Sequence, residues 1–369
     1  MKFTKTFGLG VISFYLFVIL TVTGLLLMFY FIPHTERAYH DMHDLEFAVS
    51  FGMIIRNMHR WGAHGMVAVV FLHMCRVFYT AAHREPREFN WILGIVLLIL
   101  TLMLSLTGYL LPWDQLAFWA TTIVSKIMGS TWFIGDQLKY VFLGGTVVGQ
   151  NALLRNYVLH VAVLPLVMGI LIAIHFWRIR KDGGLSRPEE NMLPREDDAE
   201  VVEDRKTYGL MNRVAGRTPQ VGKEPEEMVT SWPHLLIREL VLFLTVLILI
   251  MGVSVLFDAP LEEMANPSVT PNPAKAPWYF LGIQELVAWG DPFWMGVFVP
   301  TVGVILLMLI PYLDRSRVGT GLWLHPSRRL HNVLFTIFVV VFLGLIYVGT
   351  FMRGPNWALY WPWETWPGH

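Results

Sequence analysis

Four histidines recur at matching intervals along two apolar stretches, and imidazole is a common ligand of transition metals. His59 and His73 are fourteen residues apart, and His160 and His175 are fifteen residues apart. On an α-helix, these intervals place the side chains of each pair within about 40° and about 60° of one face. At about 1.5 Å per residue, the first pair is separated by about 21 Å along the helix axis. Since the hydrocarbon core of a bilayer is about 30 Å thick, each helix is predicted to hold one imidazole near either membrane surface.

The surrounding residue types favour haem over zinc at both pairs. Zinc takes further sulfur or carboxylate ligands, but no carboxylate lies within a turn of the four histidines. Cys75 points roughly the opposite way from His73 on the helix. Haem needs two axial ligands and an apolar slot, and with both axial positions filled it has no open site for substrate. The pattern therefore predicts two bis-histidine b-type haems that carry electrons.

A histidine taken alone has a simpler interpretation. In a membrane helix it often makes core hydrogen bonds or belongs to a proton relay. A transporter or channel with a histidine relay is thus an alternative, and it predicts no haem. The two nearly equal intervals favour haem. His64 lies about 140° from His59 on the helix and is interpreted as a core residue.

Two glycine pairs follow the same interval. Gly10 and Gly24 lie in the first apolar stretch and Gly94 and Gly108 in the third, each pair fourteen residues apart. Glycine has no Cβ, so it lets a flat macrocycle or another backbone approach closely. Small residues also serve helix packing in membranes, but the repeated interval favours haem slots beside these glycines.

The composition indicates a membrane protein. Of 369 residues, 54% are hydrophobic and 14% aromatic, which exceeds the usual content of soluble domains. The formal net charge is zero, so there is no basic surface for nucleic acid. Cys75 is the one cysteine, so the chain has no internal disulfide and no C-x-x-C-H motif for a c-type haem.

Seven apolar stretches predict an all-α membrane protein, with a four-helix dihaem bundle followed by a three-helix half. They cover residues 8–32, 58–80, 91–111, 154–178, 234–257, 294–313 and 331–352. Short-loop arginines and lysines gather on one side, which is therefore predicted to be cytoplasmic, together with the N-terminus. His59 and His160 then share the outer side, and His73 and His175 share the cytoplasmic side. These are the two predicted ligand pairs.

A charged, proline-rich segment separates the two halves. Residues 182–233 have no helix-length apolar run, and such a segment buries too little surface to fold alone. We predict a four-span domain at 1–181, a cytoplasmic linker at 182–233 and a three-span domain at 234–369. A docking segment for a partner is the alternative role of the linker.

Several motifs make the chain resemble cytochrome b, and more closely cytochrome b6 and subunit IV joined in one polypeptide. They are IIRNMHRW (54–61), HMCRV (73–77), GYLLPWDQLAFW (108–119), VGQNALLRNYVLH (148–160) and PWYFL (277–281). The resemblance is strong over residues 7–181 and moderate over 234–352. The four-histidine frame is highly specific, whereas PWY alone would be weak.

The resemblance implies roles for cations near the ligands. Arg56 precedes an outer ligand by three residues, and Arg76 follows an inner ligand by three. Arginines at these motif positions bind haem propionates in the family, and a guanidinium can hold a carboxylate through two hydrogen bonds. Arg60 and Arg155 are further candidates on the outer side. Snorkelling, or contact with lipid headgroups, is the alternative role.

The resemblance also implies an outer quinol site. It would lie between an amphipathic interfacial helix predicted at 112–124 and the segment carrying Trp278 and Tyr279. The family usually has Pro-Glu-Trp-Tyr here, with the glutamate taking a quinol proton, but Pro277 stands at the glutamate position. We hypothesise that Glu285, about two helical turns further on, takes the proton instead. A structural glutamate at the interface is the alternative.

Two further expectations concern the cytoplasmic side. A quinone site is expected beside the inner haem, with Arg180 and Lys181 as candidate ligands, although cations at a helix end also serve as positive-inside anchors. Cytochrome b6 carries an extra haem on a cysteine near the start of its first helix. Gly8 stands in that register, so no covalent haem is expected.

The function implied by the resemblance is that of the cytochrome b subunit of a quinol:cytochrome c oxidoreductase. Electrons from quinol would cross the membrane through the two haems in a Q cycle. A Rieske iron–sulfur protein and a c-type cytochrome would be partners in a homodimeric complex. The complex would lie among the lipids of a prokaryotic plasma membrane. The alternative is a dihaem transmembrane electron conduit of a non-bifurcating, quinone-linked complex.

Overall fold

A computed structural model describes residues 6–182, 231–316 and 318–364. Seven helical spans in these ranges are long and apolar enough to cross a membrane, which confirms the predicted all-α membrane fold. They are built from α1 (Leu9–Met28), α3 (Gly52–Tyr79), α4 (Glu88–Tyr109), α7 (Gln150–Val158) continued by α8 (Leu164–Lys181), α10 (Leu236–Leu256), α12 (Val299–Leu313) and α13 (Arg329–Phe351). A π-helical turn, Leu159–Val163, joins α7 to α8 into one span.

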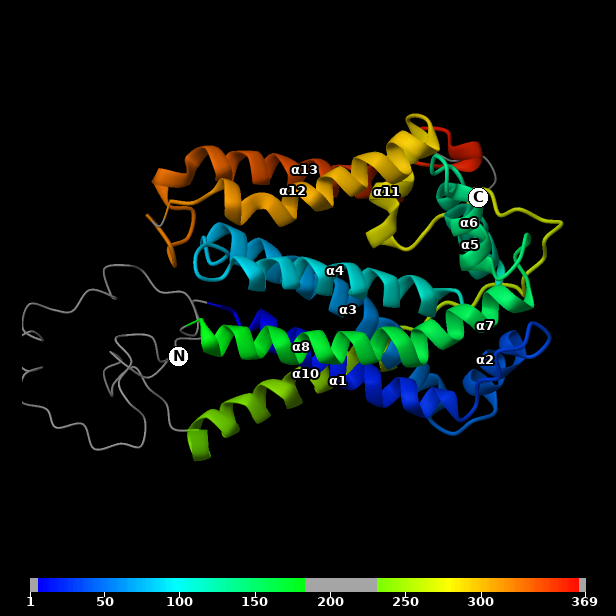
Figure 1. Ribbon diagram of the computed structural model, residues 1–369. Coiled ribbons are helices and arrows are strands. Elements are labelled where there is room, and N and C mark those ends of the chain that lie inside the picture. The colour runs from blue at the N-terminus through cyan, green and yellow to red at the C-terminus, as the bar shows by residue number, and fades with distance from the viewer. Residues whose placement is uncertain (1–5, 183–230, 317, 365–369) are drawn as a thin grey trace, which may run out of the picture.

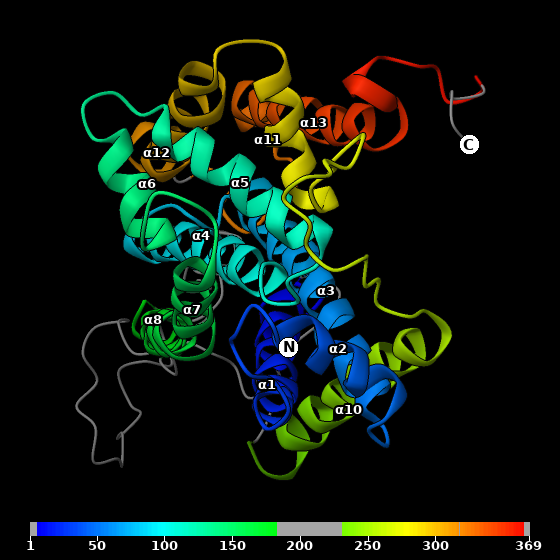
Figure 2. The same cartoon turned by 90° about the vertical axis from the view of Figure 1, so that its right-hand side faces the viewer.

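The first four spans form a bundle, seen end-on in Figure 2. In it α1 packs against α3, α3 against α4, and α4 against α8. The later spans flank this bundle, with α10 against α3 and α12 against α4. Helix α11 (Trp278–Ala288) packs along α13. Every span is predominantly apolar, so lipid-facing and core-facing sides are both hydrophobic, as expected in a bilayer.

The short helices between spans gather at one end of the bundle. Helices α2 (Ala38–Phe47), α5 (Gln115–Gly129), α6 (Gly135–Leu143) and α11 all lie at the right of Figure 1. Helix α5 is the interfacial helix predicted at 112–124. It begins where the Asp114 carboxylate accepts a hydrogen bond from the Ala117 N–H at 2.8 Å, which caps the first turn. This end corresponds to the predicted outer side.

The apolar pattern placed the start of α3 six residues too late. The helix begins at Gly52, because Arg56 and Asn57 are buried and find hydrogen-bond partners in the last turn of α10 and in the segment that follows it. The Asn57 amide donates to the carbonyl of Ser254 at 2.9 Å and accepts from the Ala259 N–H at 2.8 Å. Hydropathy alone cannot anticipate such remote partners.

Most of the predicted linker, 182–233, lies outside the described residues.

A buried ionic cluster joins the two halves at the opposite end. Asp314, after α12, binds Arg84 of the α3–α4 turn and accepts two hydrogen bonds from Arg328, at 3.0 and 2.7 Å. Arg328 also donates to the carbonyl of Phe78 at 2.8 Å. Buried charges are tolerated when they are paired and hydrogen-bonded. This cluster therefore fixes α12 and α13 against the α3–α4 turn.

Candidate functional site

The outer histidines face each other across the bundle. The ring centres of His59 on α3 and His160 in the α7–α8 span are 6.0 Å apart, with an interplanar angle of 79°. Two imidazoles that bind one metal through bonds of about 2 Å place their ring centres about 6 Å apart. The spacing of this pair is thus suited to axial ligation of one iron.

Hydrogen bonds orient both outer rings. Thr23 donates its hydroxyl to the carbonyl of Ile19 at 2.8 Å, so it accepts from Nδ1–H of His59 at 2.9 Å. His160 donates from Nδ1–H to the carbonyl of Leu104 at 3.1 Å. In both rings Nε2 then keeps its lone pair and is free to bind metal, the arrangement that neighbouring groups impose on ligating histidines.

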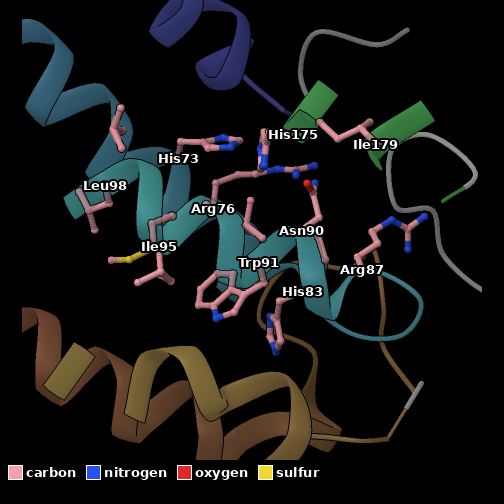
Figure 3. Close-up of a pocket in the computed structure, with 15 residues that line it drawn as sticks. His73, Arg76, His83, Arg87, Asn90, Trp91, Ile95, Leu98, His175 and Ile179 are labelled. Atoms are coloured by element: carbon pink, nitrogen blue, oxygen red, sulfur yellow. The ribbon is translucent and has the colours of Figure 1, made fainter. Parts of the chain in front are cut away.

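The inner histidines line a second cavity near the opposite end. His73 and His175 border it together with Arg76, His83 and Asn90 (Figure 3). Much of the remaining lining is apolar, including Trp91, whose ring centre lies 5.1 Å from that of His83. Two imidazoles, an apolar wall and an arginine fit the needs of a haem and its propionates.

Each of the four glycines lies against one of the four histidines. A Cβ on Gly10 would come within 3.1 Å of the His73 ring and one on Gly24 within 3.2 Å of His59. On Gly94 it would lie 3.7 Å from His175, and on Gly108 it would overlap the His160 ring. The matching intervals therefore have a physical basis: the glycines leave room for the imidazole rings. Contact with the macrocycle itself stays a prediction.

The predicted arginines divide between the cavities and other contacts. Arg56 and Arg60 line the outer cavity, and Arg76 lines the inner one. Arg56 also donates to the carbonyls of Ala259 and Pro260 at 2.7 and 2.9 Å. It is therefore held by the segment after α10 as well as facing the cavity.

Three other predicted cations lie elsewhere in the described structure. Arg155 donates to the carbonyl of Val141 on α6 and is absent from the described lining of the outer cavity. Arg180 and Lys181 are exposed at the end of α8, and neither borders the described inner cavity. Lys181 lies over the Trp177 ring at 4.8 Å. These positions match anchors at a membrane surface.

The outer cavity continues past the histidine pair to the predicted quinol segment. This cavity of about 240 Å³ is bordered by Tyr279 and His64 on one side and by His59 and His160 on another. Burial raises the pKa of the Tyr279 phenol, so it stays protonated at neutral pH. Trp278 donates from Nε1 to Nδ1 of His64 at 3.1 Å.

The structure gives Glu285 a different role from the hypothesised one. Its carboxylate is fully buried and receives hydrogen bonds from Arg353 at 2.6 and 3.0 Å, from Trp289 at 2.7 Å and from Trp357 at 3.2 Å. Burial alone would raise the pKa of Glu285, but these donors outweigh it and hold the pKa below its ordinary value. Glu285 is also absent from the described lining of the cavity. An anchored carboxylate of this kind is a poor proton acceptor for quinol.

Sequence reasoning missed two contributors to this region. His64 was interpreted as a core residue, yet it borders the cavity and contacts Tyr279, with ring centres 5.6 Å apart. Its position about 140° from His59 turns it toward α11. Arg353 was assigned no role, because its partner Glu285 is 68 residues away. No local pattern in the sequence signals either contact.

Comparisons with known proteins agree with this geometry. A family model described as "Cytochrome b(N-terminal)/b6/petB" matches residues 64–273, and "Cytochrome b(C-terminal)/b6/petD" matches residues 264–365. The chain is 42% identical to a cytochrome b6 of Heliomicrobium gestii, over 48% of this chain and 83% of that protein. It is 44% identical to a cytochrome b6 of Heliobacterium mobile, over 47% of this chain and 82% of that protein.

The fold also matches a solved structure. A chain of "Hyperthermophilic respiratory Complex III" superposes with a TM-score of 0.75 at 26% sequence identity. The match covers 94% of this chain and 84% of the other. The likeness therefore extends over both halves, beyond the portion shared with the b6 relatives.

Proposed function

Because the chain belongs to the cytochrome b family, with b6-like and subunit IV-like parts in one polypeptide, we propose that it is the dihaem subunit of a quinol-oxidising complex. Quinol binds at the outer cavity and releases two protons on that side. One electron goes to a Rieske iron–sulfur protein and on to a c-type cytochrome. The other crosses the membrane to a quinone at the cytoplasmic side, which makes a Q cycle.

One observation carries this proposal. Four histidines form two facing pairs at two depths of one helical bundle, and a glycine lies beside each ring. A proton relay would need side chains with exchangeable protons along its path. The cavity around each histidine pair is instead lined mainly by apolar side chains. Bis-histidine pairs in apolar cavities support haem binding.

The chain's own residues hold and orient the two groups. His59 and His160 would ligate the outer haem, and His73 and His175 the inner one. When bound, each haem would supply reversible one-electron transfer. Thr23 and the Leu104 carbonyl orient the outer rings through Nδ1. Arg76 at the inner cavity, and Arg56 with Arg60 at the outer, supply cations for propionates.

The outer substrate site centres on Tyr279, and Glu285 is no longer part of it. Trp278 contributes through its bond to His64. Arg180 and Lys181 lie at the surface and outside the inner cavity, so they could contribute to a cytoplasmic quinone site only through their positive charge. We further propose a homodimeric complex in a prokaryotic plasma membrane, with the N-terminus in the cytoplasm, as the distribution of short-loop cations indicates.

The test is haem counting in the purified complex, followed by reduction with a soluble quinol. Pyridine haemochrome spectra should give two b-type haems per chain, and His160→Leu should leave one, because the outer iron loses an axial ligand. Duroquinol added without oxygen should reduce the haems of the wild type. Retention of both six-coordinate haems in His160→Leu would contradict the proposal.

One observation favours a second candidate, a non-bifurcating dihaem conduit. No carboxylate borders the outer cavity among the residues that the structure describes, so the usual proton-accepting side chain is missing there. Stoichiometry separates the two candidates. Bifurcation requires that oxidation of one quinol delivers one electron to a Rieske centre and one to a b haem, whereas a conduit delivers both along one route.

A further inference from the structure

His64 is a polar side chain of the outer cavity to which the proposed function assigns no role. Its ring borders the cavity, and its position on α3 turns it away from the His59 face and toward α11. It contacts Trp61 at a ring-centre distance of 5.3 Å and Tyr279 at 5.6 Å. Three aromatic neighbours, counting Trp278, therefore fix the orientation of this imidazole.

The bond from Trp278 determines which ring nitrogen of His64 carries the proton. Indole Nε1–H is a donor only, and it donates to Nδ1 of His64 at 3.1 Å. Nδ1 must therefore hold a lone pair, and a neutral imidazole then carries its hydrogen on Nε2. The tautomer is opposite to that of His59 and His160, whose Nδ1 atoms donate. His64 is thus prepared to donate rather than to bind a metal.

The Nε2–H donor of His64 has no partner among the described residues. Nε2 is buried and makes no hydrogen bond there. Leaving a buried donor unsatisfied is energetically costly, so such a donor beside a cavity favours a ligand with an acceptor oxygen. Tyr279 forms the adjoining wall, and its protonated phenol adds no negative charge to the site. A carbonyl or phenolic oxygen on a flat, apolar ring suits these surroundings.

We propose that His64, held by Trp278, donates a hydrogen bond from Nε2–H to a ring oxygen of the quinol or quinone in the outer cavity. The inference rests on the proposed function, because it names the group that binds that substrate. His64 keeps its proton throughout, so no proton transfer is assigned to it. The same bond strengthens as the quinol oxygen gains negative charge on losing its proton, which favours oxidation.

Three substitutions at position 64 distinguish hydrogen-bond donation to the substrate from a role of the side chain in packing. In His64→Leu the donor is lost, and kcat/KM for duroquinol should fall about tenfold, the upper range for one hydrogen bond. His64→Gln should recover most of this loss, because its amide oxygen can accept from Trp278 while its NH₂ donates to the ligand. His64→Ala, a small residue tolerated in membrane helices and without a side-chain donor, repeats the test if leucine disturbs assembly. His43→Leu, on the exposed face of α2, is the matched control and should behave as wild type.

A spectroscopic readout tests the bond directly. The carbonyl stretch of ¹³C-labelled duroquinone bound to the intact complex should lie at lower frequency in the wild type and the glutamine variant than in the leucine or alanine variant. Haem content should be unchanged in all four. Equal frequencies and equal kcat/KM in wild type and in whichever of His64→Leu or His64→Ala retains its haems would overturn the inference.

The outcome also distinguishes this inference from the proposed function. If duroquinol fails to reduce the haems but bound duroquinone shows the His64-dependent shift, the function fails and the assignment of His64 stands. If duroquinol reduces the haems and neither readout depends on residue 64, the function stands and His64 has no part in binding. If duroquinone does not bind at all, both are overturned.

Discussion

At the scale of single residues, the chemistry depends on which nitrogen of each imidazole carries the proton. In His59 and His160, Nδ1–H donates a hydrogen bond and Nε2 keeps its lone pair. In His64, Nδ1 accepts from Trp278, so the proton lies on Nε2. Histidines of the same bundle are therefore suited to the two tasks that we propose for them, metal ligation and hydrogen-bond donation. Neighbouring donors and acceptors make this difference.

The glycines beside the ligands give a prediction at this scale. In Gly108→Val the added side chain would overlap the His160 ring, so this variant should lose the outer haem or show a shifted spectrum for it. Gly303→Val on α12 is the control, since a Cβ there meets no atom within 4 Å. Reduced-minus-oxidised spectra measure both variants. An unaltered outer haem in Gly108→Val would show that the ring does not need this space.

At the scale of elements, two buried ionic groups hold the second half of the chain in place. Asp314 binds Arg84 and Arg328 at one end of the bundle. At the other end Glu285 joins α11 to the segment that follows α13, through Arg353. Removing one partner of a buried pair is more harmful than never having had the pair, because it leaves an uncompensated charge.

The Glu285 pair gives a pH-dependent prediction. Its folded-state pKa lies below the ordinary value of 4.5, so its contribution to stability is fully present above about pH 4.5 and is lost as pH falls through the folded pKa. Glu285→Gln should lower the free energy of unfolding at pH 7 by about 3 kcal/mol, and the difference from wild type should shrink under acid. Thermal unfolding midpoints of the detergent-solubilised complex between pH 7 and pH 3 measure this.

The control is Glu262→Gln, an exposed carboxylate in the loop before α11, which should leave the midpoint unchanged. If Glu285→Gln kept wild-type stability but slowed quinol oxidation, the structural role of the Glu285–Arg353 ion pair would be contradicted. The result would instead support Glu285 as the proton acceptor.

At the scale of the whole molecule, the two ends of the bundle differ in kind. Interfacial helices α2, α5, α6 and α11 cover the end that holds the outer cavity (Figure 1). The other end carries the short turns with Arg84, Arg87 and Arg328. This asymmetry is consistent with the proposed substrate site at one surface, and the arginines at the other surface accord with the positive-inside rule.

The orientation can be tested with single cysteines. Phe133, between α5 and α6, is 96% exposed, and Val318, after α12, is 52% exposed. Cys75 is buried and should not compete for reagent. In intact cells a membrane-impermeant maleimide should label Phe133→Cys, whereas Val318→Cys should react only after permeabilisation. The reverse pattern would invert the proposed topology.

The sequence by itself determined the seven spans and the depth of each histidine, because helical periodicity and bilayer thickness act on neighbouring residues. It also predicted which histidines meet, since antiparallel spans bring together side chains of equal depth. Only the tertiary structure decided that Arg353 forms an ion pair with Glu285 and that His64 borders the outer cavity. Those contacts join residues 68 to 215 positions apart, such as Glu285 with Arg353 and His64 with Tyr279. Such contacts depend on how segments distant in the sequence pack against each other, and no local pattern encodes that.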